Sequence, residues 1–265
     1  MLFARLNPDL NRKTTRGGIR KFMTEAMIGS IISALSTGLG AIPILFMTKV
    51  THRLRDILLA YAAGIMTSAS MYSLIPEALG QSNLIVLSIG ILAGSCILLI
   101  LERYIPHIDL ENPESRPFNI EGKAFLIIAA ITMHNLPEGL SVGVSYASSD
   151  DSLGNLIALS IGLQNAPEGF LVALFLVNQN IGRFKALGIA TLTGAVEIIT
   201  AFIGYTLSSV VDGLVPYGLA FAAGAMMFIV YKELIPESHG DGNQRVATIS
   251  FLLGLITMIT LTEIF

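Results

Sequence analysis

Residues 123–147 read KAFLIIAAITMHNLPEGLSVGVSYA, and residues 153–177 read LGNLIALSIGLQNAPEGFLVALFLV. Each stretch is apolar toward both ends and is long enough to cross the hydrocarbon core of a bilayer, which takes about 20 residues. Each also carries a polar motif near its middle, HNLPEG at 134–139 and QNAPEG at 164–169. The two stretches therefore predict a pair of membrane-spanning helices with ionisable side chains at the same depth.

Six further apolar stretches of similar length complete the pattern. They lie at 24–47, 54–76, 84–101, 186–209, 216–236 and 246–265. Hydrophobic residues make up 53% of the 265 residues and charged residues 13%, which is about half of the charged share of a soluble globular protein. The mean hydropathy is +0.70. The sequence therefore predicts an all-α polytopic membrane protein with eight transmembrane helices, and it excludes a fibrous, disordered or nucleic-acid-binding chain.

Charge divides the chain into a tail and one transmembrane domain. Residues 1–23 form a basic N-terminal tail, and 24–265 form the domain, whose longest connection is the polar loop 102–122. Lysine and arginine occur in the connections after the first, third, fifth and seventh stretches and are missing from the other three. The positive-inside rule therefore predicts a cell-membrane protein with these four connections in the cytoplasm and both termini outside. The basic tail itself favours the opposite orientation.

Two motifs are repeated in a way that indicates internal symmetry. HNLPEG is echoed by QNAPEG, and AAG at 62–64 with LIPE at 74–77 is echoed by AAG at 222–224 with LIPE at 234–237. Each copy lies an odd number of crossings from its twin, so the two copies run in opposite directions through the membrane. This predicts a 3+2+3 inverted-repeat arrangement, which secondary transporters build around a binding site near the bilayer midplane.

The fourth, fifth and sixth stretches carry ionisable and amide side chains near their middle, where such groups are costly and need a partner or a function. Those predicted to bind metal are His134, Asn135, Glu138, Gln164, Asn165, Glu168 and Glu197. His134 and Glu138 are four residues apart, so they share one face of a helix. Pro137 and Pro167 are expected to kink their helices and to free a backbone carbonyl beside these side chains.

One imidazole, three carboxylates and three amides form a ligand set that suits a divalent ion such as zinc, iron, manganese, cobalt or cadmium. The single cysteine, Cys96, excludes a Cys-based zinc site and a disulfide framework within one chain. The other interpretation is a structural polar network that holds the helices together, as amides and glycines do in membranes. The amides taken alone fit that structural role most readily, and Glu197 taken alone fits it more readily than the four ionisable residues do together.

The HNLPEG and QNAPEG pair resembles the metal motifs of the ZIP family of divalent metal transporters, and in detail the bacterial GufA-like branch of that family. The resemblance covers nearly all of the chain after the tail. It implies a midplane site on the residues above that holds one or two metal ions, with the metal as transported substrate and no cofactor. Asn165 departs from relatives that carry Asp there, and Lys232-Glu233 stands where some relatives have His-Glu near the cytoplasmic exit.

We therefore expect a secondary transporter, not an enzyme, that imports divalent metal ions, chiefly zinc, into the cytosol. Its expected partners are the metal ion and the lipid bilayer, with a homodimer as a candidate assembly and no nucleic acid. Three alternatives stay open: a metal-dependent intramembrane hydrolase, a proton-coupled carrier for a non-metal cation, and a channel. The hydrolase is disfavoured because His134 is the only histidine at membrane depth and no HExxH motif is present.

Overall fold

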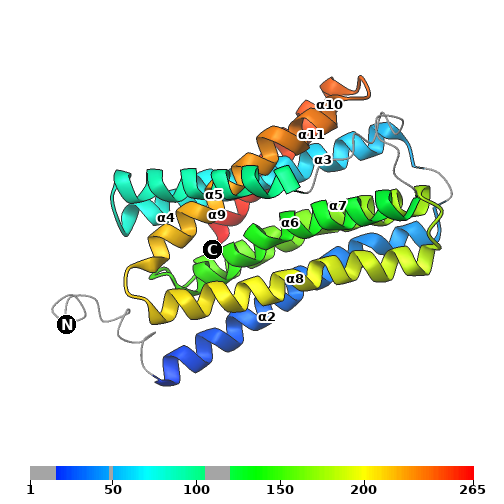
Figure 1. Ribbon diagram of the computed structural model, residues 1–265. Coiled ribbons are helices and arrows are strands. Elements are labelled where there is room, and N and C mark those ends of the chain that lie inside the picture. The colour runs from blue at the N-terminus through cyan, green and yellow to red at the C-terminus, as the bar shows by residue number, and fades with distance from the viewer. Residues whose placement is uncertain (1–15, 48–49, 105–119) are drawn as a thin grey trace.

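The computed structural model describes residues 16–47, 50–104 and 120–265, and within these ranges it contains helices and no strand (Figure 1). Side chains are not described at 16–20, 104, 120–124 and 126–127. The elements in chain order are α2 (Arg16–Ala41), η2 (Ile42–Leu45), α3 (His52–Ser68), η3 (Ala69–Leu74), α4 (Ile75–Gly80), α5 (Leu84–Tyr104), α6 (Ile120–Ala147), α7 (Leu153–Asn178), α8 (Arg183–Val210), α9 (Leu214–Ile229), η5 (Val230–Leu234), α10 (Ile235–His239) and α11 (Gln244–Ile264).

The helices match the predicted membrane crossings. Counted over the described residues, seven helical segments are long and apolar enough to cross a bilayer. The remaining predicted crossing is α6, a helix of 28 residues that carries the HNLPEG motif. The bounds agree closely; α7, for example, occupies Leu153–Asn178 where the sequence predicts 153–177. The prediction of an all-α polytopic membrane protein is therefore confirmed.

The first helix begins earlier than the sequence predicts. Helix α2 starts at Arg16, so residues 16–23 of the predicted tail are helical, and 1–15 lie outside the described residues. A helix can continue past the hydrocarbon core because its polar side chains are solvated there. Lys21 and Glu25 illustrate this with an i,i+4 ion pair of 3.7 Å.

The predicted loop 102–122 is also shortened by helix at both ends. Helix α5 continues to Tyr104 and α6 begins at Ile120. Residues 105–119, which make up the rest of this predicted loop, lie outside the described part of the chain.

The second and seventh crossings are not regular α-helices. Each contains a π-helical turn, η3 or η5, directly before the Ile-Pro of the repeated LIPE segment. The N–H of Ile75 donates to the carbonyl of Ser70, and the N–H of Ile235 donates to that of Val230, which is the i→i−5 pattern of a π turn. The proline that follows has no N–H with which to continue the α-helical pattern. Turns of this kind are frequent at functional sites.

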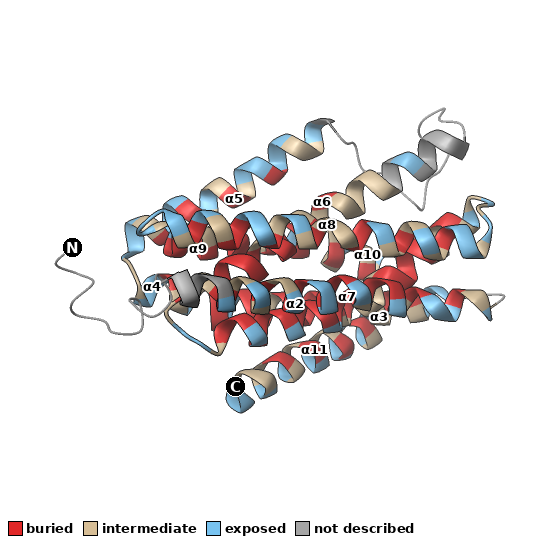
Figure 2. Ribbon diagram, turned by 90° about the horizontal axis from the view of Figure 1, so that it is seen from below, coloured by how far each residue is buried: buried red, intermediate tan, exposed pale blue. Residues whose placement is uncertain are grey.

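The helices form two groups that pack against each other, one in the lower and one in the upper half of Figure 1. In the lower group, α2 packs on α7 and α8, and α6 packs on α8. In the upper group, α3 pairs with α11 and α5 pairs with α9. Contacts of α3 with α7 and of α6 with α9 join the groups. Figure 2 shows that burial concentrates between the groups, whereas the outward faces of α5 and α11 are exposed.

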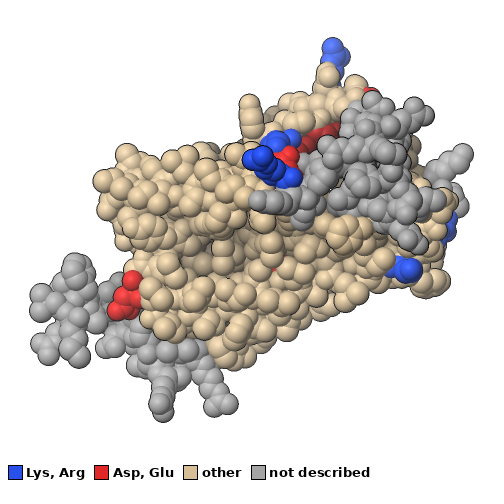
Figure 3. All heavy atoms as spheres, in the orientation of Figure 1, with Lys and Arg blue, Asp and Glu red and all other residues tan. Residues whose placement is uncertain are grey.

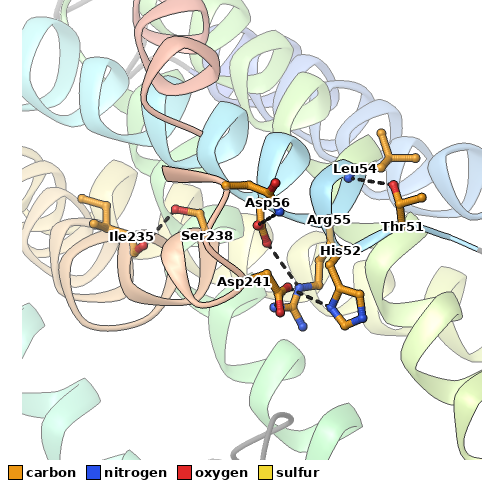
Figure 4. A network of polar contacts seen from close by, with 9 residues as sticks. Thr51, His52, Leu54, Arg55, Asp56, Ile235, Ser238 and Asp241 are labelled. Carbon is orange, nitrogen blue, oxygen red and sulfur yellow. Dashed lines mark hydrogen bonds and ion pairs between the residues drawn. The ribbon is translucent and has the colours of Figure 1, made fainter. Parts of the chain in front are cut away.

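Polar contacts between connections identify one end of the bundle. His52 Nδ1 lies 2.9 Å from Asp241 Oδ2, and Arg55 Nη2 donates to the same oxygen over 2.7 Å (Figure 4). Arg183 Nη1 donates to the backbone oxygen of Leu45 over 3.1 Å. The connections α2–α3, α7–α8 and α10–α11 therefore meet at this end. On the face shown in Figure 3, the Lys and Arg side chains of the described residues lie toward it, with acidic atoms beside one group of them. Other acidic side chains lie at the opposite end.

Glycines permit the closest approach within the upper group. A Cβ on Gly64 of α3 would lie 2.1 Å from the backbone oxygen of Phe251 on α11, and a Cβ on Gly224 of α9 would lie 2.2 Å from that of Ile91 on α5. Gly64 and Gly224 are the glycines of the two AAG segments. Both copies of this repeat therefore use glycine in the same way, to bring one helix backbone against the next.

The substitution Gly64→Ala should lower the melting temperature of the detergent-solubilised protein, measured by thermal unfolding. The added methyl group collides with the backbone of α11, and overpacking of a tight interface costs about 1–3 kcal/mol. Gly188→Ala on α8 is the matched control, because among the described residues no atom beyond its own stretch of helix lies within 4 Å of the added Cβ. Equal melting temperatures for the two variants would contradict a tight contact between α3 and α11.

Candidate metal site

Helix α7 places two amides at the level where α6 and α8 carry carboxylates. Gln164 Nε2 donates to Glu138 Oε1 over 2.8 Å, and Asn165 Nδ2 donates to Glu197 Oε1 over 2.8 Å. Glu138, Gln164 and Glu197 are 0% exposed and Asn165 is 1% exposed. Residues from the fourth, fifth and sixth predicted crossings thus meet in the interior through amide–carboxylate hydrogen bonds.

The residue after each motif glutamate explains how the helices come this close. A Cβ on Gly139 would lie 2.4 Å from the backbone oxygen of Glu197, and a Cβ on Gly169 would lie 1.9 Å from that of Thr37. These glycines bring α6 against α8 and α7 against α2. The proline before each glutamate lies inside an uninterrupted helix, and the kink expected at each proline stays a prediction.

A serine on the first helix joins the same group, and sequence analysis missed it. Ser33 Oγ donates to Glu197 Oε2 over 2.6 Å, and Asn165 Nδ2 lies 3.2 Å from both the hydroxyl and the backbone oxygen of Ser33. Both carboxylate oxygens of Glu197 therefore accept a hydrogen bond. The signal in the sequence is weak: Ser33 lies at helical spacing from Ser30 and Thr37 in an otherwise apolar stretch.

His134 contacts a glutamate of another helix and not Glu138, the residue that its spacing along α6 suggests. Its Nε2 lies 2.5 Å from Oε2 of Glu233 on η5, and the two side chains are 15% and 11% exposed. Glu168 lies within electrostatic range of His134, Glu233 and Glu138. His134 thus connects α6 to the upper helix group, and Glu168 is near both this ion pair and the amide–carboxylate group.

Several buried polar atoms of this region have no hydrogen-bond partner among the described residues. They include Glu138 Oε2, Gln164 Oε1, Asn165 Oδ1 and Asn135 Nδ2. A buried polar group without a partner costs about 1–3 kcal/mol. Carboxylate and amide oxygens can also coordinate a divalent cation, so a bound ion would remove this cost for the three oxygens.

The predicted ligands do not converge as one compact cluster of charged side chains. Within the described ranges, no three His, Cys, Asp or Glu side chains lie close enough to hold a metal ion by themselves. Glu138 and Glu197 are each bonded to a separate amide, and His134 is turned to Glu233. An ion bound here would therefore combine carboxylate with amide oxygens, or would draw His134 away from Glu233.

Comparison with known proteins settles the family. Residues 111–262, more than half of the chain, match the family model described as ZIP zinc transporter. The chain belongs to the ZIP zinc transporter family. The resemblance that the HNLPEG and QNAPEG motifs carry is thereby confirmed.

Similar proteins align with this ZIP chain over most of its length. The zinc transporter GufA of Myxococcus xanthus is 34% identical over 90% of this chain and 98% of its own length. The zinc transporter ZIPB of Bordetella bronchiseptica is 34% identical over 92% of this chain and 82% of its own length. The zinc transporter ZupT of Streptococcus mutans is 27% identical over 88% of this chain and 94% of its own length. All three are named as transporters, so the expectation that this ZIP chain is not an enzyme is confirmed.

Ser33→Ala should destabilise the detergent-solubilised protein by about 1–3 kcal/mol, because it leaves a buried carboxylate oxygen of Glu197 without its donor. Thermal unfolding measures this loss. Ser36→Ala on the same helix is the matched control, since Ser36 Oγ donates within its own helix, to Ile32 O over 3.0 Å. An unchanged melting temperature for Ser33→Ala would mean that the hydroxyl contributes nothing to holding α2 against α8.

Proposed function

We propose that this chain is a secondary transporter that imports divalent metal ions, chiefly zinc, into the cytosol. The observation that carries this proposal is a set of buried oxygens that have no hydrogen-bond partner in the described part of the chain. They are Glu138 Oε2, Gln164 Oε1 and Asn165 Oδ1, where α6, α7 and α8 meet. Family membership and relatives named as zinc transporters support zinc as the cargo. Iron, manganese, cobalt and cadmium suit the same ligands and are expected to compete.

The proposed site divides into two positions. Its residues are His134, Asn135, Glu138, Gln164, Asn165, Glu168 and Glu197. At the first position, Glu138 and Glu168 supply negative charge, Gln164 supplies an oxygen, and His134 supplies an imidazole nitrogen once it leaves Glu233. Zinc accepts both ligand types. At the second position, Glu197 and Asn165 are already bonded to each other and to Ser33, which favours a single bound ion.

The two ends of the bundle support an orientation in the membrane that fits import. The end where His52, Arg183 and Asp241 meet carries the basic connections, so we assign it to the cytoplasm by the positive-inside rule. Both termini then lie outside the cell membrane. His134, which precedes Glu138 by one turn of α6, and Glu233 beside it lie on the side of the site that faces that end, which agrees with metal release there.

The pairing of helices supports the inverted repeat. In a 3+2+3 arrangement, the pair α3–α11 is the twin of α9–α5, and α2–α7 is the twin of α8–α6. All four pairs are major contacts of the structure. The repeated π turns and the repeated glycine contacts of Gly64 and Gly224 agree with it. A hydrolase would have no use for this symmetry, and catalytic zinc is usually held by more than one histidine.

Zinc uptake into proteoliposomes tests the function. Glu138→Gln should abolish saturable uptake, because it removes a charge that the ion needs at the site, and Glu168→Gln should do the same. Glu263→Gln, at an exposed position near the end of α11, is the matched control and should transport normally. Normal uptake by the Glu138→Gln or Glu168→Gln variant at equal protein levels would defeat the site assignment.

Asn165→Asp should raise the number of zinc ions bound per chain from about one to about two, measured by equilibrium dialysis of the purified protein. The change replaces a donor to Glu197 by a second carboxylate, and two adjacent buried carboxylates are stabilised by a cation between them. Asn155→Asp is the control, since Asn155 is exposed and accepts a hydrogen bond from Tyr146. An unchanged stoichiometry would show that Glu197 is purely structural.

A further inference from the structure

A stripe of serines leads from the proposed metal site to the end of the bundle opposite the basic connections. Ser141 and Ser145 on α6, and Ser148 directly after it, follow Glu138 at spacings of three or four residues. Such residues lie on one face of a helix. All three serines are 0% exposed, as is Glu138. The face of α6 that extends outward from Glu138 is therefore hydroxyl-lined and completely buried.

A ring of hydrogen bonds closes the outer end of this stripe. Ser148 Oγ donates to Oε1 of Glu77, which lies on α4. Gln81 Nε2 donates to the same carboxylate oxygen over 2.5 Å and to Ser148 Oγ over 2.7 Å. Glu77 lies in α4 and Gln81 directly after it, and Ser148 directly follows α6, so the ring joins the upper and lower helix groups at the outer end.

Inside the closure, hydroxyl groups lack partners. Ser145 Oγ and the hydroxyls of Ser70 and Ser73 on η3 are buried without a hydrogen-bond partner among the described residues. Ser73 precedes Glu77 by about one helical turn, and both η3 and α6 pack against α7 and α9. A buried hydroxyl group without a hydrogen-bond partner lowers the stability of the fold. Its oxygen can, however, form a hydrogen bond with a water molecule or transiently coordinate a partly dehydrated cation.

The repeat shows that the stripe is not simply a by-product of the fold. When QNAPEG is aligned with HNLPEG, the positions on α7 that correspond to the three serines are occupied by Leu171, Phe175 and Asn178. Because α6 and α7 run in opposite directions, these residues lead toward the basic end. The face of α7 that leads from the motif toward the basic end therefore does not carry the serines that α6 presents on the side from which the proposed cargo enters.

We propose that the serine stripe of Ser141, Ser145 and Ser148 is the route by which a divalent cation reaches Glu138 from outside, and that Glu77, Gln81 and Ser148 close this route. The proposal rests on the proposed import function. The hydroxyls replace the water of the ion in steps and bind it weakly, so they govern the rate of loading and leave the equilibrium affinity to the ligands around Glu138.

Thiol accessibility tests the route in intact cells. In a Cys96→Ala background, the thiol introduced by Ser145→Cys should react with a membrane-impermeant, positively charged thiol reagent added outside, and excess zinc should slow the reaction. Glu77→Gln should speed it about tenfold, since the change weakens a charge-assisted hydrogen bond of the closure. Phe175→Cys, at the corresponding position of α7, is the matched control and should not react from outside.

The kinetics of uptake show whether Ser145 lines the entry route or binds the ion at equilibrium. Ser145→Val should reduce the initial rate of zinc uptake about tenfold and leave zinc affinity in equilibrium dialysis within about twofold, a shift of less than roughly 0.5 kcal/mol. A Ser145→Cys protein that imports zinc while its thiol stays unreactive from outside would overturn the proposal. So would a Ser145→Val protein that has lost affinity as well as rate.

Two further measurements keep the outcomes separate. If Ser145→Cys does not reach the membrane, Ser141→Cys reports on the same stripe one turn deeper. A Ser141→Cys thiol that reacts from outside supports the route, and an unreactive thiol in a protein that imports zinc overturns it. Failure of the chain itself to bind zinc would contradict the proposed function, whereas normal zinc binding with an unreactive stripe would contradict the route alone.

Discussion

A polar side chain in the hydrocarbon core of a bilayer has no water to bond with, and this constraint organises the molecule. Glu138 and Glu197 come from different helices, and each accepts a hydrogen bond from an amide of α7. Ser33 adds α2 to the same level. Four helices are thereby held in register at one depth, and glycines let their backbones come close enough for these bonds to form.

Both helix groups combine polar contacts with glycines that lie against the backbone of a neighbouring helix. In the upper group, Ser250 Oγ donates to the backbone oxygen of Ile57, which joins α11 to α3, and Ser95 Oγ donates to that of Gly224, which joins α5 to α9. The ion pair between His134 and Glu233 crosses from one group to the other. Separation of the groups at this level would therefore break an ion pair and release an imidazole, so the proposed coordination of metal by His134 would be coupled to the packing of the two groups.

Much of the fold could be predicted from the sequence because the thickness of the bilayer leaves little choice of helix length. Hydropathy indicates where the chain leaves the membrane and not where a helix ends. It therefore could not predict that α2 begins at Arg16. The sequence predicts that the candidate ligands lie at a common depth in the membrane, but it does not predict which side chains they contact. Serine in a membrane helix often bonds its own backbone, as Ser36 does, and only tertiary packing shows that Ser33 reaches Glu197 and that Glu233 lies against His134.

The two π turns carry a consequence for how the chain tolerates changes of length. A π turn holds more residues than the α-helical turn it replaces, and each residue of an α-helix advances the side chains by about 100° around the axis. Deletion of one residue from Ala69–Leu74 could restore a regular helix, yet it would swing Glu77 away from Ser148. The same deletion in Val230–Leu234 would swing Glu237. Insertions and deletions in these segments should therefore be tolerated less well than most substitutions, because they change the direction in which the glutamates point.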